Sequence, residues 1–352
     1  MTQASTYRIG FDVAKGVFQV HGVKNEVGEP VAIKRRLKRG AVEGFFAKLP
    51  ASLIGMEACG SAQHWARLAQ SYGHEVRLMP PAYVKAYVKR NKTDAHDAAA
   101  ICEAVARPSM RFVAVKSEAD QATLMLHRMR ASFVAKRTAA ANQLRAAFAE
   151  FGLVAPVGAC GFKELLTLME SGAESFTRLP QTLRLVLREL ALQWKNCEAA
   201  VRRMDVAIAA GVKTSERARR LMRVPGIGPV GASAIDALLP DAQLFRSGRD
   251  FAAWVGLTPR EDSSGKTVKR GPITKKGDGY LRRLLVLGAT AHLARVRRGQ
   301  AKGASAWVIK MAAHPKRKLA AVALANKTAR IAWAMLARNQ DYRAPAAVLQ
   351  AA

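Results

Sequence analysis

Residues 91–98 read NKTDAHDA and place two carboxylates, Asp94 and Asp97, three residues apart at the start of a predicted helix. Thr93 and Asp94 are residue types that favour the N-cap, and residues 98–106, AAAICEAVA, are mostly good helix formers. Side chains at positions i and i+3 of a helix lie on the same face. The pair therefore has two interpretations: it complements the helix dipole, or it holds a divalent metal ion that faces a phosphate.

The segments upstream of this helix predict an α/β domain. Residues 7–13, 17–23 and 31–36 form three strand-like runs separated by turn residues at 14–16 and 28–30, which predicts an antiparallel meander. The elements expected next are a short helix at 41–48, a buried strand at 53–56, a helix at 62–72, a strand at 74–78 and a helix after Pro80 and Pro81. This order resembles the RNase H-like fold.

Two further acids occupy strands of this predicted domain. Asp12 lies between Phe11 and Val13 in the first strand, and Glu57 follows the buried strand. A carboxylate buried there without a partner would cost several kcal/mol, so Asp12 either pairs with a metal or a cation, or lies on the solvent face. Two-metal phosphodiester chemistry needs oxygen ligands that converge from different elements. Asp12, Glu57, Asp94 and Asp97 would supply four.

The composition points to a polyanionic partner. The chain has 352 residues, half of them hydrophobic, and 57 Lys and Arg against 26 Asp and Glu, which gives a net charge of +31. Nucleic acid is the expected partner. No apolar run approaches the ~18 residues of a spanning helix, and no signal peptide is evident, so a cytoplasmic protein without membrane contact is expected. The four cysteines lack CxxC spacing and are expected to be buried thiols.

Long helices are predicted after residue 116. Residues 118–151 have helix-forming composition, and a second long helix should begin after Pro180 and end at Gly211. Its apolar residues follow steps of four and three: Leu183, Leu187, Leu190, Trp194, Cys197, Val201, Met204 and Ile208. This heptad pattern predicts a coiled coil between copies of the chain, or packing against the 118–151 helix within one chain.

A helix-hairpin-helix pattern follows the long helices. Residues 217–223 read as a helix, 225–229 read PGIGP, and a second helix should follow. Glycines in such a turn allow backbone amides at a helix N-terminus to approach a phosphate. The alternative is that the hairpin is a packing unit.

Residues 256–266 read GLTPREDSSGK, and a basic loop then leads to a helix from Tyr280. A Ser-Ser-Gly sequence is ordinarily only a turn. Here, however, it precedes a tract, residues 279–340, that contains no Asp or Glu. The basic residues noted in this tract are Arg282, Arg283, Arg295, Arg297, Arg298, Lys302, Lys310, Lys316, Arg317 and Lys318. Such a surface favours nucleic-acid binding.

Taken together, NKTDAHDA, PGIGP, GLTPR and the Ser-Ser-Gly sequence occur in an order that resembles the DEDD transposases of bacterial insertion sequences, the RNA-guided bridge recombinases. The resemblance covers nearly the whole chain. It implies a RuvC-like domain at 1–116, a helical coiled-coil region at 117–212 and a mostly helical transposase domain at 213–345.

The resemblance also implies site residues and partners. Four acids that bind Mg²⁺, with Mn²⁺ as a substitute, fall on Asp12, Glu57, Asp94 and Asp97. A serine nucleophile falls on Ser263, with Ser264 as the alternative. The implied partners are donor and target DNA, a noncoding guide RNA encoded by the element, and further copies of the chain as a dimer or tetramer.

The expected function is therefore that of a transposase that cuts and rejoins DNA through a serine. Two alternatives remain at this point: a RuvC-like nuclease that uses metal-activated water, and a structural nucleic-acid binder in which the acids and the serine are inert.

Overall fold

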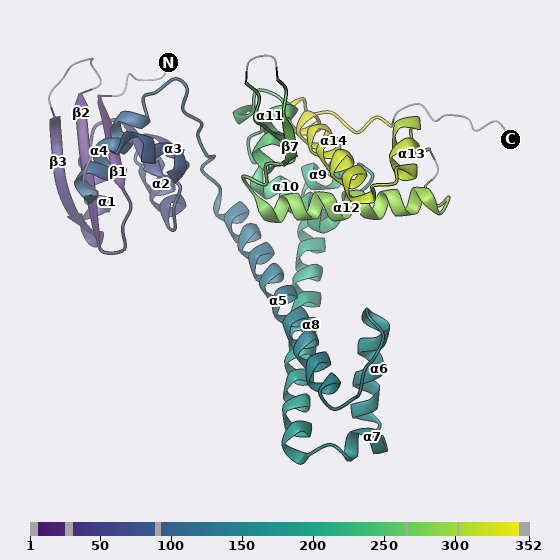
Figure 1. The fold of residues 1–352 in the computed structure, drawn as a ribbon. Helices are drawn as coiled ribbons and strands as arrows, with labels where there is room; N and C mark the ends of the chain where they lie inside the picture. The colour runs from purple at the N-terminus through teal and green to yellow at the C-terminus, as the bar shows by residue number, and fades with distance from the viewer. Residues whose placement is uncertain (1–5, 25–30, 89–92, 265–266, 302, 345–352) are drawn as a thin grey trace. The chain divides into compact units, whose positions relative to one another are not determined.

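The structure, a computed structural model, describes residues 6–24, 31–88, 93–264, 267–301 and 303–344 (Figure 1). The chain forms two compact units. The first comprises Met1–Asp120 with Leu239–Arg246, and the second comprises Gln121–Leu238 with Ser247–Ala352. The three-part division of the sequence stays a prediction. The turn predicted at 28–30 lies outside the described residues.

A five-stranded sheet forms the centre of the first unit. The strands are β1 (Tyr7–Asp12), β2 (Val17–Lys24), β3 (Val31–Lys38), β4 (Leu53–Glu57) and β5 (Glu75–Met79). Their order is β3-β2-β1-β4-β5, with the first three antiparallel and β4 and β5 parallel to β1. The predicted meander and the strands after it are confirmed, with shifts of one or two residues at their ends.

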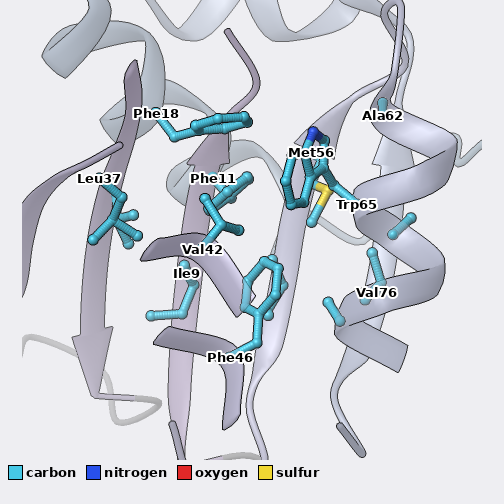
Figure 2. Close-up of a cluster of buried hydrophobic side chains, with 14 of the residues drawn as sticks. Ile9, Phe11, Phe18, Leu37, Val42, Phe46, Met56, Ala62, Trp65 and Val76 are labelled. Atoms are coloured by element: carbon cyan, nitrogen blue, oxygen red, sulfur yellow. The ribbon is translucent and has the colours of Figure 1, made fainter. Parts of the chain in front are cut away.

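The first unit also contains four α-helices and two 3₁₀ helices among the described residues before Glu118. They are α1 (Val42–Lys48), α2 (Ala62–Ser71), α3 (Pro81–Val84) and α4 (Asp94–Ala104), with the 3₁₀ helices η1 (Arg39–Ala41) and η2 (Lys85–Tyr87). Alternate residues of β1 and β2, among them Phe11 and Phe18, pack with Phe46 of α1 and Trp65 of α2 in one apolar core (Figure 2). That core occupies one face of the sheet, because residues of a strand alternate between its two faces.

Two long helices dominate the first half of the second unit. They are α5 (Glu118–Ala149) and α8 (Gln181–Thr214), joined through α6 (Ala159–Glu170) and α7 (Glu174–Thr177). Arg130 of α5 binds Asp205 of α8 through two hydrogen bonds, of 2.5 and 3.3 Å, and Arg137 binds Glu198. The two long helices are therefore partners within one chain.

The predicted heptad seam of α8 is covered inside the chain. Leu187 is fully buried in a cluster with Leu144 and Phe148 of α5, and Cys197, Val201 and Ile208 are also buried. This is the second of the two interpretations of the seam. Gly211 does not end the helix, which continues to Thr214, because a single glycine costs only about 1 kcal/mol in a helix.

The remainder of the second unit is mostly helical. It contains α9 (Glu216–Leu221), α10 (Pro229–Leu238), α11 (Gly248–Val255), α12 (Gly279–Arg297), α13 (Ala306–Ala313) and α14 (Arg317–Ala337), with a hairpin of β6 (Pro259–Glu261) and β7 (Arg270–Ile273). The 3₁₀ helix η3 (Ala242–Leu244) lies between α10 and α11 in sequence and belongs to the first unit. The predicted class, an α/β domain followed by a mostly helical region, is confirmed.

The expectation for the cysteines is wrong for two of the four. Cys102 and Cys197 are buried, whereas Cys59 and Cys160 are exposed. Cys59 lies in the turn after β4, and Cys160 lies in the first turn of α6, where neither side chain faces a core. Among the described helices, none is long and apolar enough to cross a membrane.

Candidate active site

Asp12 and Glu57 project from the same face of the sheet. Phe11 pairs with Met56 across the parallel strands β1 and β4, so Asp12 and Glu57 are the next residues along each strand. Phe11 and Met56 are fully buried in the core on the other face. Because side chains alternate along a strand, the two carboxylates both point away from that core.

Helix α4 covers this second face at two glycines. A Cβ atom at Gly10 would lie 2.0 Å from the carbonyl oxygen of Ala98, and one at Gly55 would lie 2.8 Å from Cβ of Val105. Any side chain at Gly10 would therefore push α4 off the sheet. Alternate positions on the same strands carry Asp12 and Glu57, which places these acids beside the helix rather than beneath it.

The direction of α4 brings its first turn to the acidic end of the sheet. The Cys102 thiol donates to the carbonyl oxygen of Arg8 at 3.2 Å, whereas Ala98 lies over Gly10. The part of α4 from Cys102 back to Ala98 therefore runs alongside β1 in the direction from Arg8 to Asp12. One more turn reaches Asp94, so α4 carries Asp94 and Asp97 toward the end of β1 that bears Asp12.

The predicted start of α4 is confirmed. Thr93 is the N-cap, and its hydroxyl accepts a hydrogen bond of 3.3 Å from the backbone N–H of His96. Asp94 is exposed and Asp97 is half-buried. Asn91 and Lys92, which opened the predicted stretch, lie outside the described residues.

The electrostatics of this edge suit a divalent cation. Cys59 is exposed as a residue, but partial desolvation of its thiol, and then the charges of Glu57 and Asp12, raise the pKa of this thiol, so the negative potential of the two acids reaches it. A set of carboxylate oxygens is the donor type that Mg²⁺ prefers. Within the described part of the chain, no three His, Cys, Asp or Glu side chains are already spaced to hold an ion. The exposed first turn of α4 would have to close on the strands.

The predicted serine lies in the loop of the β6–β7 hairpin. Ser263 is exposed, and its hydroxyl accepts a hydrogen bond of 3.2 Å from the backbone N–H of Lys269. The same hydroxyl donates to Oε1 of Glu261 at 3.4 Å. Ser264 instead pairs with Thr267 through backbone hydrogen bonds of 3.2 and 3.1 Å. Gly265 and Lys266 lie outside the described residues.

Glu261 is the residue that the sequence analysis missed. It ends β6, two residues before Ser263, and its carboxylate accepts the hydrogen bond from the Ser263 hydroxyl. The available signal for this contact was the spacing of two residues between Glu261 and Ser263. The structure supplies a carboxylate beside the Ser263 hydroxyl from the same hairpin.

The predicted helix-hairpin-helix segment lies between α9 and α10. Gly226 has a φ of +92° and packs against α12, where a Cβ on Gly288 would lie 1.9 Å from the carbonyl oxygen of Gly226. These two glycines allow the turn and the helix to touch. In the acid-free tract, Arg282 is bound internally, because its guanidinium donates to the carbonyl oxygen of Val255 at 2.8 Å. Arg283, Arg295, Arg297 and Arg298 are exposed, and Lys302 lies outside the described residues.

Two family models match the chain. One, described as "Transposase IS116/IS110/IS902 family", matches residues 218–304, and a DEDD transposase model, described as "Transposase", matches residues 9–152. A "Probable family 20 transposase" of Pseudomonas aeruginosa is 47% identical over 96% of this chain and 98% of its own length. The "Transposase for insertion sequence element IS1111A" of Coxiella burnetii is 37% identical over 95% of this chain and 91% of its own length.

The chain belongs to the IS116/IS110/IS902 family of transposases. It is thus a DNA-cleaving and DNA-transferring enzyme of insertion sequences, as the sequence predicted. The DEDD transposase model spans Asp12, Glu57, Asp94 and Asp97. The second model spans the turn at Gly226 and the loop of Ser263. Domains of the DEDD transposase type are typically metal-dependent.

Proposed function

We propose that this transposase cuts and rejoins DNA through Ser263, assisted by a metal-binding cluster of Asp12, Glu57, Asp94 and Asp97. The observation that carries the proposal is the pairing of β1 with β4, which puts Asp12 and Glu57 on one face of the sheet, next to the helix α4 that bears Asp94 and Asp97. Acids that only complemented a helix dipole, or only faced solvent, would not need to lie on the same face of the sheet.

Mg²⁺ is the proposed ion, with Mn²⁺ as a substitute, because all four proposed ligands are carboxylates. When bound between such ligands, the ion supplies stabilisation of charge on the reacting phosphodiester. Asp12 and Glu57 are fixed by the sheet, whereas Asp94 and Asp97 belong to the first turn of α4. Asp12 and Glu57 would therefore set the position of the ion, and Asp94 and Asp97 would complete its set of ligands.

The proposed covalent step takes place at the Ser263 oxygen. This oxygen forms a bond to phosphorus and the bond from phosphorus to one bridging ester oxygen breaks, so one DNA end is joined to Ser263 through a phosphodiester. The other DNA end leaves as an alkoxide, which becomes a hydroxyl by taking up the proton that the serine released. A serine hydroxyl needs a base to accept its proton. The carboxylate of Glu261, 3.4 Å from Oγ of Ser263, already accepts a hydrogen bond from this hydroxyl. The Lys269 N–H would keep the serine oxygen oriented.

The proposed partners are donor and target DNA, a noncoding guide RNA and further copies of the chain. The net charge of +31 and the acid-free tract at 279–340 favour nucleic acid in general. The guide RNA rests on the family resemblance. For a dimer or tetramer, the exposed residues Leu185, Leu192 and Val206 of α8 offer an apolar stripe at heptad spacing, separate from the buried seam.

The acidic cluster is tested by neutralising its members. Asp12→Asn or Asp97→Asn should abolish strand cleavage yet leave DNA binding largely intact, because each removes a ligand without touching the basic surface. Glu103→Gln, at the other end of α4, is the matched control and should cut at nearly the wild-type rate. Undiminished cleavage in EDTA, or by the Asp12→Asn protein, would overturn the proposed metal-binding role.

A further inference from the structure

One row of side chains crosses three adjacent strands of the first unit. Asp12 of β1 pairs with Gln19 of β2, and Gln19 pairs with Arg36 of β3. Directly opposed residues of antiparallel strands project from the same face. Arg36 therefore lies on the face that carries Asp12. Lys34 lies on this face as well, because it is two residues from Arg36 and pairs with His21.

A groove connects this row to the first turn of α4. It has a volume of about 570 Å³ and is lined by Gln19, Lys34, Arg35, Arg36, Thr93, Asp94 and Ala95. We call it the β3 groove. One wall is basic and comes from β3, and the other contains Asp94, one of the four acids proposed to bind metal. The basic wall and the acidic cluster are thus neighbours in a single surface.

Among the described residues, the exposed basic side chains on this side of β3 form no ion pair with a carboxylate. Lys34, Arg36 and Lys38 are exposed, and none of the ion pairs among the described residues involves them. Their side chains follow one another along one side of a strand, about 7 Å apart. Like charges so close repel, and a linear polyanion that runs along the strand would relieve this repulsion.

We propose that the β3 groove holds the phosphate backbone of the DNA strand that is to be cut, with Arg36 and Lys34 binding phosphates beside the acidic cluster. The inference rests on the proposed function and adds positioning residues to it. DNA is favoured over the guide RNA because the groove ends at Asp94, in the cluster assigned to cutting. The Gln19 amide, between Arg36 and Asp12 in the row, can donate to a phosphate oxygen at the junction.

The first test compares two double variants with the same loss of charge. Lys34→Gln with Arg36→Gln should lower cleavage at subsaturating DNA by about tenfold or more, with recovery at saturating DNA and an unchanged Mg²⁺ dependence. Lys24→Gln with Lys48→Gln is the control. Both control lysines are exposed, and Lys24 points to the face opposite Arg36. Equal behaviour of the two double variants would overturn the proposal and would assign the basic strand to protection of the sheet edge.

The second test does not depend on cleavage. A photo-crosslinking amino acid replaces Arg36 in full-length Asp97→Asn protein, which is then irradiated with labelled DNA of its element and with the RNA that co-purifies. An adduct on the DNA strand supports the proposal, whereas an adduct on RNA alone, or none, overturns it. Failure of the proposed function has a different signature, namely cleavage by the Asp12→Asn protein while the crosslink to DNA persists.

Discussion

Glu261 is the last residue of the three-residue strand β6, and the hydroxyl of Ser263, two residues further on, donates a hydrogen bond to its carboxylate. Glu261→Gln preserves the shape of the side chain and removes its ability to accept a proton. General-base catalysis contributes roughly 10²–10⁴-fold, so single-turnover cleavage should slow by about 10²-fold or more.

Asp262→Asn is the control for that substitution, because among the described hydrogen bonds of the Ser263 hydroxyl none joins it to the Asp262 carboxylate. It should cleave at nearly the wild-type rate. A Glu261→Gln protein with wild-type kinetics would show that the proton of Ser263 goes to a group outside the hairpin.

At the scale of residues, the sequence identified the acids themselves more readily than the side chains that lie beside them in the fold. Asp12 and Glu57 stood out because each is a charged residue in an apolar strand, and they end the neighbouring parallel strands β1 and β4. Glu261 did not stand out, because β6 is too short to show alternation in a turn-rich stretch. The row from Asp12 through Gln19 to Arg36 depends on strand register, which sequence alone leaves open.

Helix α8 presents two apolar stripes with different environments. Leu187 is 0% exposed in the cluster with α5, α6 and α7, whereas Leu185, two residues earlier, is 60% exposed. Leu187→Ala should lower the free energy of unfolding by about 2–5 kcal/mol, because it leaves a cavity. Leu185→Ala should change it by about 0.5 kcal/mol or less. Denaturant unfolding of the full chain measures both, and equal losses would contradict the buried assignment of the seam.

A buried polar network joins four helices of the second unit. His127 of α5 is almost fully buried, with one ring nitrogen 3.0 Å from the Tyr280 hydroxyl of α12 and the other 3.0 Å from the Ser233 hydroxyl of α10. Arg130, bound to Asp205 of α8, lies nearby. Burial, and then the charge of Arg130, lower the pKa of His127 from 6.5 to about 4.

This lowered pKa predicts acid sensitivity. Between about pH 6.5 and 4 the unfolded chain binds a proton at His127 that the folded chain does not, so stability falls as the pH falls through that window. The loss reaches up to about 3 kcal/mol and stops below the folded-state pKa. His127→Gln retains Arg130 and Asp205 but has no imidazole, so its unfolding free energy should depend less on pH in this window. Identical pH profiles would refute the buried neutral histidine.

At the scale of elements, local patterns predicted the helices and strands, and tertiary contacts decided their partners. The heptad spacing of α8 fits a partner helix from the same chain or from another copy. The choice follows from α5, whose Arg130 and Arg137 meet Asp205 and Glu198. Such ion pairs are difficult to predict from the sequence, because the two residues of each pair are more than sixty positions apart.

At the scale of the whole molecule, composition was the most dependable guide. A net charge of +31 predicts a polyanionic partner regardless of how the chain folds. Family membership agrees with that prediction, since transposases act on DNA. Neither composition nor family membership establishes that Ser263 and the four acids act in the same reaction. The serine and the acids belong to different compact units, so their cooperation is a chemical proposal and needs a chemical test.

The most direct test is to search for a covalent protein–DNA adduct and map it. Wild-type protein is incubated with DNA of its element and Mg²⁺, denatured rapidly, digested and examined by mass spectrometry. We predict a phosphodiester adduct on Ser263 that persists in Ser264→Ala protein and is absent from Ser263→Ala and Asp97→Asn proteins. Cleavage without any adduct, or an adduct on Ser264, would contradict the assignment of Ser263 as the nucleophile.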